Sequence, residues 1–152
     1  MRQRLSRHAG IAALLLALVA VAGSARAEQF RSFGDYEVHY NAVRSDFIAP
    51  EAAAQHGLTR SATRGLLNVA VLRRADDGTQ VHSEATLAVT VRGSESAGRT
   101  IRMRPIREPG VLYYIGEFRI AGADTWQFEL AVQPADSAET FNIRFSQLLL
   151  AD

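Results

Sequence analysis

The stretch TWQFELAVQ, residues 125–133, decides the fold, because its apolar side chains fall on every second position. The stretch FNIRFS, residues 141–146, repeats the alternation a few residues later. Successive side chains of a strand point to opposite faces, so a period of two predicts strands with one buried and one solvated face. That division is typical of antiparallel sheets. The side chains expected to face inward are Trp126, Phe128, Leu130, Val132, Phe141, Ile143 and Phe145.

The same alternation extends through most of the chain, and helical periodicity is nearly absent. Further strands are expected at residues 30–40, 66–73, 81–92, 100–106 and 112–120. About seven strands separated by turn signals predict an all-β fold, a single antiparallel β-sandwich of immunoglobulin-like architecture. A small barrel is the alternative. One short helix is expected near residues 50–56, with Pro50 at its first position and Gly57 just after its end.

A hairpin is expected around residues 76–78, where Asp-Asp-Gly suits a three-residue loop with glycine in the left-handed conformation. Pairing Ala75 with Thr79 then sets Leu67 opposite Leu87, apolar on apolar. Register is strongly specified when one face is buried. The alternation of apolar residues therefore favours a three-residue loop over a two-residue loop. The strands on either side of the loop are therefore predicted to be neighbours in one sheet.

A second hairpin is expected around residues 109–110. Parity pairs Arg102 with Glu117 on the solvated face and sets Arg104 opposite Ile115. Because the carboxylate engages Arg102, Arg104 is expected to be the freer cation for an anionic ligand. The remaining members of this basic segment are Arg99 and Arg107. Such a segment suits phosphate, lipid A or an acidic glycan, and a solvated, ion-paired sheet face is the alternative.

The first 27 residues have the features of an export signal. A basic start (Arg2, Arg4, Arg7) precedes an apolar run at residues 11–22 and the small-residue site ARA at residues 25–27. A helix over that run spans about 18 Å, too short for a hydrocarbon core of about 30 Å. We expect a signal peptide at 1–27, cleavage before Glu28, a mature domain at 28–152, a periplasmic location and no membrane insertion afterwards. An uncleaved anchor is the alternative.

Composition narrows the possible functions. The chain of 152 residues has no Cys, which excludes a disulfide scaffold and a thiolate metal site. All 17 basic residues are arginine, against 16 acidic residues. Removing residues 1–27 removes four arginines and no acid, leaving 13 basic against 16 acidic residues, a net charge of −3. A mildly acidic domain lacks the basic footprint of a nucleic-acid-binding protein, so no such partner is expected.

Four short runs carry a resemblance to one bacterial family: FGDYEVHYN at residues 33–41, RS at 60–61, GLLNV at 65–69 and YYI at 113–115. The sequence resembles the family of domain of unknown function 4426, whose members are small exported proteins of Gram-negative bacteria. The resemblance spans essentially the whole mature chain and implies a periplasmic location. It implies no activity and supplies no site residues.

Candidate binding residues come from one polar interruption and one long connection. Asn68 breaks an otherwise apolar strand, so its amide needs a partner. It either ties down a loop such as 58–63 or lines a ligand cleft. Residues 41–64 form the longest stretch without strand character, and long connections in compact domains are often functional. The candidate ligand- or partner-binding residues are Arg60, Arg64, Asn68, Arg104 and Tyr113.

No catalytic residue, metal site or cofactor is expected. Glu37 and His39 share one face of a strand but need a third ligand to hold a metal, which favours a solvated face. The sequence indicates a non-enzymatic binding or interaction module of the cell envelope. Its partner, an unidentified envelope protein or ligand, would meet residues 41–64 or an exposed sheet edge. A periplasmic hydrolase acting on an envelope component and a structural subunit of an envelope assembly are the alternatives.

Overall fold

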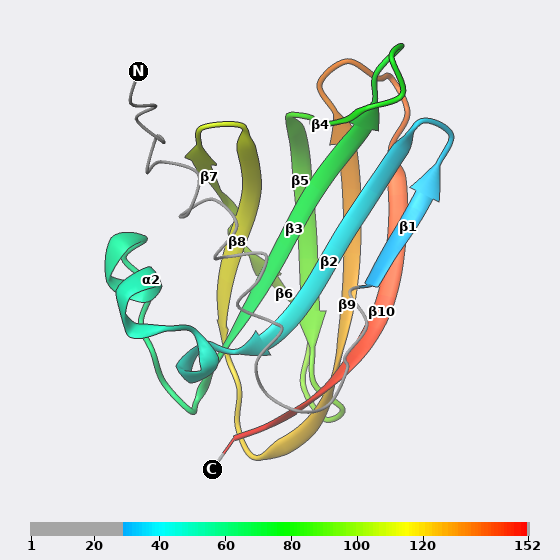
Figure 1. The fold of residues 1–152 in the computed structure, drawn as a ribbon. Coiled ribbons are helices and arrows are strands. Elements are labelled where there is room, and N and C mark those ends of the chain that lie inside the picture. The colour runs from blue at the N-terminus through cyan, green and yellow to red at the C-terminus, as the bar shows by residue number, and fades with distance from the viewer. Residues whose placement is uncertain (1–28, 152) are drawn as a thin grey trace, which may run out of the picture.

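The computed structural model describes residues 29–151, so the predicted signal peptide lies outside the described residues. Two antiparallel sheets face each other as a sandwich (Figure 1). Sheet A has the order β1-β2-β3-β8-β7 with β4 paired to β3, and sheet B has the order β10-β9-β5-β6. The strands are β1 Gln29–Phe33, β2 Tyr36–Arg44, β3 Arg64–Arg74, β4 Gln80–His82, β5 Ala85–Arg92, β6 Arg99–Ile101, β7 Arg104–Glu108, β8 Val111–Arg119, β9 Ala123–Pro134 and β10 Phe141–Leu150. The predicted antiparallel sandwich is confirmed, and two separate sheets rule out the barrel.

The main core lies between the sheets, and the predicted alternation fills it. The inward-facing side chains of β9 are buried, and those of β10 pack beside them. The rings of Phe128 and Phe145 stack with centroids 4.6 Å apart. Sheet A contributes Val38, Leu67 and Val69, none of which is exposed.

Strands β3 and β8 are buried on both faces, which produces a second, smaller core. On the outer face of sheet A, Leu66, Tyr113 and Ile115 pack against Ala53 and Leu58 of the connection between β2 and β3. This connection holds the short 3₁₀ helix η1, Ser45–Phe47, and the helix α2, Pro50–Gln55, which lies at the left in Figure 1.

The predicted short helix is confirmed within a residue. Pro50 stands in the first turn of α2, where its missing N–H is not needed. His56 is the C-terminal cap, and Gly57 follows with a φ of 61°, a left-handed conformation that favours glycine. Six residues are too few for a stable isolated helix, so α2 depends on its packing against sheet A.

The loop at residues 76–78 forms as predicted, and the predicted register holds for β4, which pairs with the end of β3, but the predicted pairing of residues 85–87 with β3 is wrong. The Ala75 amide donates to the Thr79 carbonyl oxygen at 2.8 Å, and Gly78 has a φ of 83°. The ladder then ends with β4, and the chain crosses to sheet B, where β5 pairs with β9. Leu67 lies opposite Gly116 of β8, and Leu87 lies opposite Val132. Parity could not decide this, because an apolar strand face matches any other apolar strand.

Residues 100–106 were predicted as one strand and form parts of two strands in different sheets. β6 pairs with β5 in sheet B, while β7 pairs with β8 in sheet A around a two-residue turn at 109–110. The predicted register is correct where that ladder exists, with Arg104 opposite Ile115. The ladder stops there, so Arg102 and Glu117 do not pair, and that prediction is wrong.

Within residues 29–151 the structure has ten strands instead of the expected seven, because the predicted strands 30–40, 81–92 and 100–106 each divide into two. Residues 30–40 contain a hairpin in which Phe33 pairs with Tyr36 across a turn. Gly34 in that turn has a φ of 59°. Val81, the first residue of the predicted strand 81–92, is 40% exposed in the short strand β4. Within residues 29–151, no helix is long and apolar enough to cross a membrane.

Candidate functional site

A cleft of about 640 Å³ opens at one end of the sandwich. One wall comes from the connection that precedes β3, and the other comes from the loop between β5 and β6. The end of β8, the turn that follows it and Trp126 of β9 complete the cleft. Its lining residues are Thr59, Ser61, Thr63, Arg64, Ser96, Ala97, Arg99, Arg119, Ile120, Ala121 and Trp126.

Three arginines meet in this cleft because three strand ends meet there. Arg64 begins β3, Arg99 begins β6 and Arg119 ends β8. The register between β3 and β8 sets Arg64 directly opposite Arg119. The Arg99 guanidinium lies over the Trp126 ring, 5.4 Å from its centroid, and donates through Nη2 to the Arg119 carbonyl oxygen. The Arg99 side chain is thus held in place by a cation–π contact and a hydrogen bond.

No carboxylate in residues 29–151 forms a salt bridge with any of these three arginines. The acidic groups on the flanking positions bind backbone amides. Glu117 Oε1 accepts from the Thr59 amide at 3.2 Å, and Asp124 Oδ2 accepts from the Ser94 amide at 3.0 Å. Hydrogen bonds from Ser94 hold the pKa of Asp124 below its usual value.

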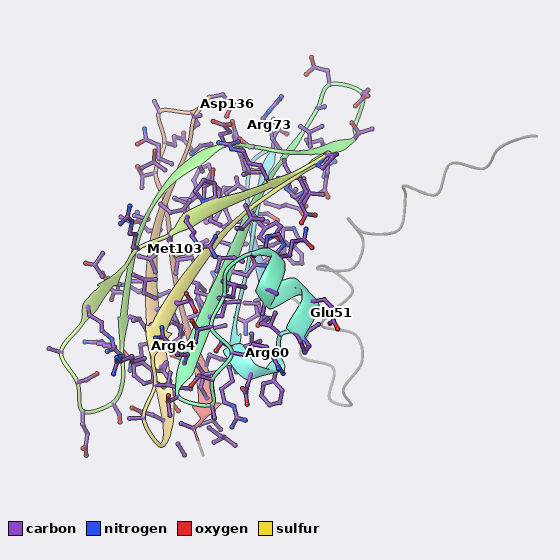
Figure 2. All side chains as sticks on the ribbon, turned by 90° about the vertical axis from the view of Figure 1, so that its left-hand side faces the viewer. Glu51, Arg60, Arg64, Arg73, Met103 and Asp136 are labelled. Atoms are coloured by element: carbon purple, nitrogen blue, oxygen red, sulfur yellow. The ribbon has the colours of Figure 1, made fainter. Side chains whose placement is uncertain are left out.

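At the opposite end of the sandwich, Arg73 is paired with a carboxylate. Figure 2 shows Arg64 near one end of the molecule, and Arg73 and Asp136 at the other. Arg73 Nε lies 3.1 Å from Asp136 Oδ2, and Tyr36 Oη donates to Asp136 Oδ1 at 2.7 Å. This hydrogen bond lowers the pKa of Asp136.

The wall formed by the connection is fixed by its own hydrogen bonds. Ser45 is buried, and its Oγ donates to the Thr59 carbonyl oxygen at 2.7 Å and accepts from the Ser61 amide at 3.0 Å. Ser61 Oγ and Thr63 Oγ1 lie 3.0 Å apart. The Ile120 amide donates to the Thr63 carbonyl oxygen at 3.0 Å, which joins this wall to the end of β8. The hydroxyl groups of the wall are thus positioned by local structure.

A second polar cluster lies beneath α2 and is covered. His56 Nε2 lies 3.2 Å from Glu108 Oε1 and 3.4 Å from Tyr113 Oη. The side chains of His56 and Glu108 are 8% and 12% exposed. Burial, with a smaller effect of the Glu108 charge, raises the pKa of Tyr113 to about 12. Arg104 Nη2 donates to the His56 carbonyl oxygen. This cluster fastens the C-terminal end of α2 to β7 and β8.

Residues 30–152 match the family described as domain of unknown function, DUF4426. The chain belongs to this family. Among solved structures it is similar to a DUF4426 family protein from Pseudomonas aeruginosa, with 26% identity and a TM-score of 0.70. The match covers 85% of this chain and 99% of that chain. The predicted resemblance is confirmed.

The chain also shares its fold with FetP of uropathogenic Escherichia coli strain F11. A copper-bound FetP variant is 9% identical with a TM-score of 0.58, over 82% of this chain and 96% of that chain. FetP as isolated, after expression in the E. coli periplasm, is 11% identical with a TM-score of 0.56, over 82% and 94% of the two chains. At these identities the likeness concerns the fold alone. No curated protein matches the sequence significantly.

The five predicted site residues of this DUF4426 protein occupy four places, and only Arg64 lines the cleft. Arg60 braces the neighbouring connection, donating from Nε to the Ile48 carbonyl oxygen and from Nη2 to the Asp46 carbonyl oxygen, both at 2.7 Å. Arg104 and Tyr113 lie together in the covered cluster below α2. Arg104 is not the freer cation that parity predicted, because it binds the carbonyl oxygen of His56.

Asn68 stands apart from the other four, in the middle of sheet A. It pairs with Asn41 on one side and Ile115 on the other. Its Oδ1 is buried and has no hydrogen-bond partner among the described residues, so its expected bond to the 58–63 loop is not formed. Asn68 is also not among the residues that line the cleft.

The cleft residues that sequence reasoning missed are Arg99 and Arg119. The sequence places Arg99 only in a basic segment, and Arg119 is not among the predicted site residues. Their meeting with Arg64 depends on the pairing of β3 with β8, two strands separated by more than thirty residues of chain. No local signal in the sequence indicates that pairing.

Glu37 and His39 do contact each other, with 3.3 Å between Glu37 Oε2 and His39 Nε2. A hydrogen bond from Gln80, followed by that from His39, lowers the pKa of Glu37. Among the residues that the structure describes, no group of three or more His, Asp or Glu side chains is arranged to hold a metal ion.

Proposed function

We propose that this protein is a non-enzymatic binding module of the cell envelope, exported to the periplasm, which holds its ligand in the arginine cleft. The observation that carries the proposal is the meeting of Arg64, Arg99 and Arg119 beside Trp126 without a paired carboxylate in the described chain. Ligand sites are typically concave and combine apolar surface with placed polar groups. This cleft contains Trp126, Ile120 and Ala121 beside its arginines and hydroxyl groups.

The chemistry of the lining supports binding rather than proton transfer. Guanidinium groups stay protonated and only donate hydrogen bonds, so they hold a ligand without acting as acid or base. The hydroxyl groups of Ser61 and Thr63 bond to each other. The acid–base cluster of His56, Glu108 and Tyr113 lies covered beneath α2 and is not part of the cleft lining.

The location in the periplasm is supported by the basic start, the apolar run and the small-residue site of the first 27 residues. The predicted importance of the connection at 41–64 is supported by its contribution of one cleft wall. A ligand of the envelope, rather than nucleic acid, suits a domain whose predicted mature charge is −3.

The test uses a variant that fills the cleft without changing its charge. Ala97 is exposed and lines the cleft, so Ala97→Phe should obstruct any ligand there. Purified wild type and Ala97→Phe are equilibrated with a small-molecule extract of the native cell envelope, washed and denatured, and the released compounds are identified by mass spectrometry. We expect at least one compound enriched on the wild type and lost from the variant.

Two other results would contradict this function. If no compound depends on an open cleft, the cleft is not a ligand site. If the dependent compound emerges hydrolysed by the wild type alone, the protein is the envelope hydrolase considered as an alternative.

A further inference from the structure

We infer that the cleft recognises an organic phosphate monoester, with its anionic group among Arg64, Arg99 and Arg119 and its organic part against Trp126. This inference rests on the proposed binding function and names the chemical class of its ligand. It is carried by the charge, the donor geometry and the apolar side of the cleft.

The charge of the cleft calls for a ligand with more than one negative charge. Three guanidinium groups line a single cleft, and none has a carboxylate of residues 29–151 within salt-bridge distance. Like charges held close together repel one another, and a bound dianion converts that repulsion into attraction. A monoester of phosphate carries about two negative charges at neutral pH, whereas a carboxylate carries one.

The donors are also more numerous than a carboxylate uses. Each guanidinium presents five N–H groups in a planar fork. Within residues 29–151, the only side-chain hydrogen bond of these three arginines runs from Arg99 to the Arg119 carbonyl oxygen. The arginines come from three strand ends, so their forks approach one space from different elements. A tetrahedral phosphate monoester presents three free oxygens to such a set, while a planar carboxylate presents two.

The apolar side of the cleft is where the organic part of the ligand would bind. Trp126, Ile120 and Ala121 line the cleft beside the arginines. The Trp126 indole N–H has no acceptor among the described residues, which leaves one more donor unmet in this region. A volume of about 640 Å³ lies within the range of pockets that take whole small molecules, so the cleft has room beyond the anionic group.

Trp126 is the single tryptophan of the chain, so its fluorescence reports on this cleft. The full-length mature protein is titrated with phenyl phosphate, inorganic phosphate and phenylacetate, by Trp126 emission and by calorimetry. Phenyl phosphate should bind saturably, at least tenfold more tightly than phenylacetate or inorganic phosphate. Its affinity should fall as salt is raised.

The variants Arg64→Gln and Arg119→Gln should each weaken phenyl phosphate at least tenfold. The matched control is Arg144→Gln, which removes the same charge from an 82% exposed side chain on β10. It should bind like the wild type. Denaturant unfolding of each variant shows whether it is folded. The inference is overturned if phenyl phosphate does not bind, if phenylacetate binds equally well, or if the control loses as much affinity as the cleft variants.

A monoester can be a lipid headgroup or a free solute, and vesicles separate the two. If the wild type sediments with phosphatidylcholine vesicles that contain phosphatidic acid, and Arg64→Gln does not, the ligand is a lipid headgroup. If the protein binds phenyl phosphate but not the vesicles, the ligand is a free ester. Both results support the inference. A third result is that phenyl phosphate fails to bind while an envelope compound is still enriched on the wild type and lost from Ala97→Phe. That result overturns this inference and leaves the proposed function standing.

Discussion

Trp126 serves the core and the cleft at the same time. It is 4% exposed and contacts Phe118 in the core, with ring centroids 5.7 Å apart. Its ring also contacts the Arg99 guanidinium in the cleft. Trp126→Ala should lower the free energy of unfolding by about 3–5 kcal/mol, because removing a buried aromatic leaves a cavity. Denaturant unfolding measures this. An unchanged midpoint would mean that the side chain does not contribute to the core, and Trp126→Phe should retain most of the stability.

Gly116 is required by the space around it. A Cβ added there would lie 2.3 Å from Ile101 Cγ2 and 2.5 Å from Met103 Sδ, both too close. Gly116→Ala should therefore destabilise the protein by about 1–3 kcal/mol, since overpacking forces neighbours to shift. Thermal unfolding measures the loss. In the double variant with Met103→Ala, part of the stability should return; strictly additive losses would contradict the proposed clash.

Tyr113 should give the protein a distinct sensitivity to alkali. Its pKa is raised to about 12 by burial, so the folded state favours the neutral phenol. The corresponding stability is present below pH 10, the value of a free tyrosine, and is lost as pH rises from 10 towards 12. Between pH 8 and pH 11, the denaturant midpoint of the wild type should fall more than the midpoint of Tyr113→Phe. Equal falls would show that this phenol does not titrate as described.

At the scale of elements, the faces of the strands were predictable and their partners were not. The alternation in β9 and β10 states which side chains are buried, and the structure agrees. Strand β3 is apolar on both faces, so any apolar strand matches it equally well. In the structure β8 pairs with β3, and β5 lies in the other sheet. This pairing depends on the packing of the whole domain. The meeting of Arg99 and Arg119 with Arg64 depends on this pairing. Only Arg64 was therefore a candidate from the sequence.

The helix α2 should open before the sheets do. It has six residues and is held by the second core and by the cluster around His56, so Tyr113→Ala should release it. Hydrogen exchange should accelerate at the amides of His56 and Leu58, which bond within the α2 segment. Exchange at Val89 should not change. Val81→Ala, at an exposed position, is the control and should leave α2 protected.

At the scale of the whole molecule, the expected processing defines the mature chain. Cleavage after residues 25–27 should leave Glu28 as the first residue of protein recovered from the periplasm, because an apolar run of this length is typical of a signal peptide. N-terminal sequencing reads this directly. A chain that still begins with Met1 and stays with the membrane fraction would identify the segment as an anchor instead.

The crossing of the chain from β4 to β5 has a consequence for how the molecule folds. Sheet A takes β1 to β4 and later β7 and β8, and sheet B takes β5 and β6 and later β9 and β10, so neither layer is a continuous piece of chain. Any continuous segment that contains all strands of one sheet also contains strands of the other. The native pairings join distant segments, a topology that folds on the millisecond-to-second scale. Both layers should therefore assemble in one cooperative step.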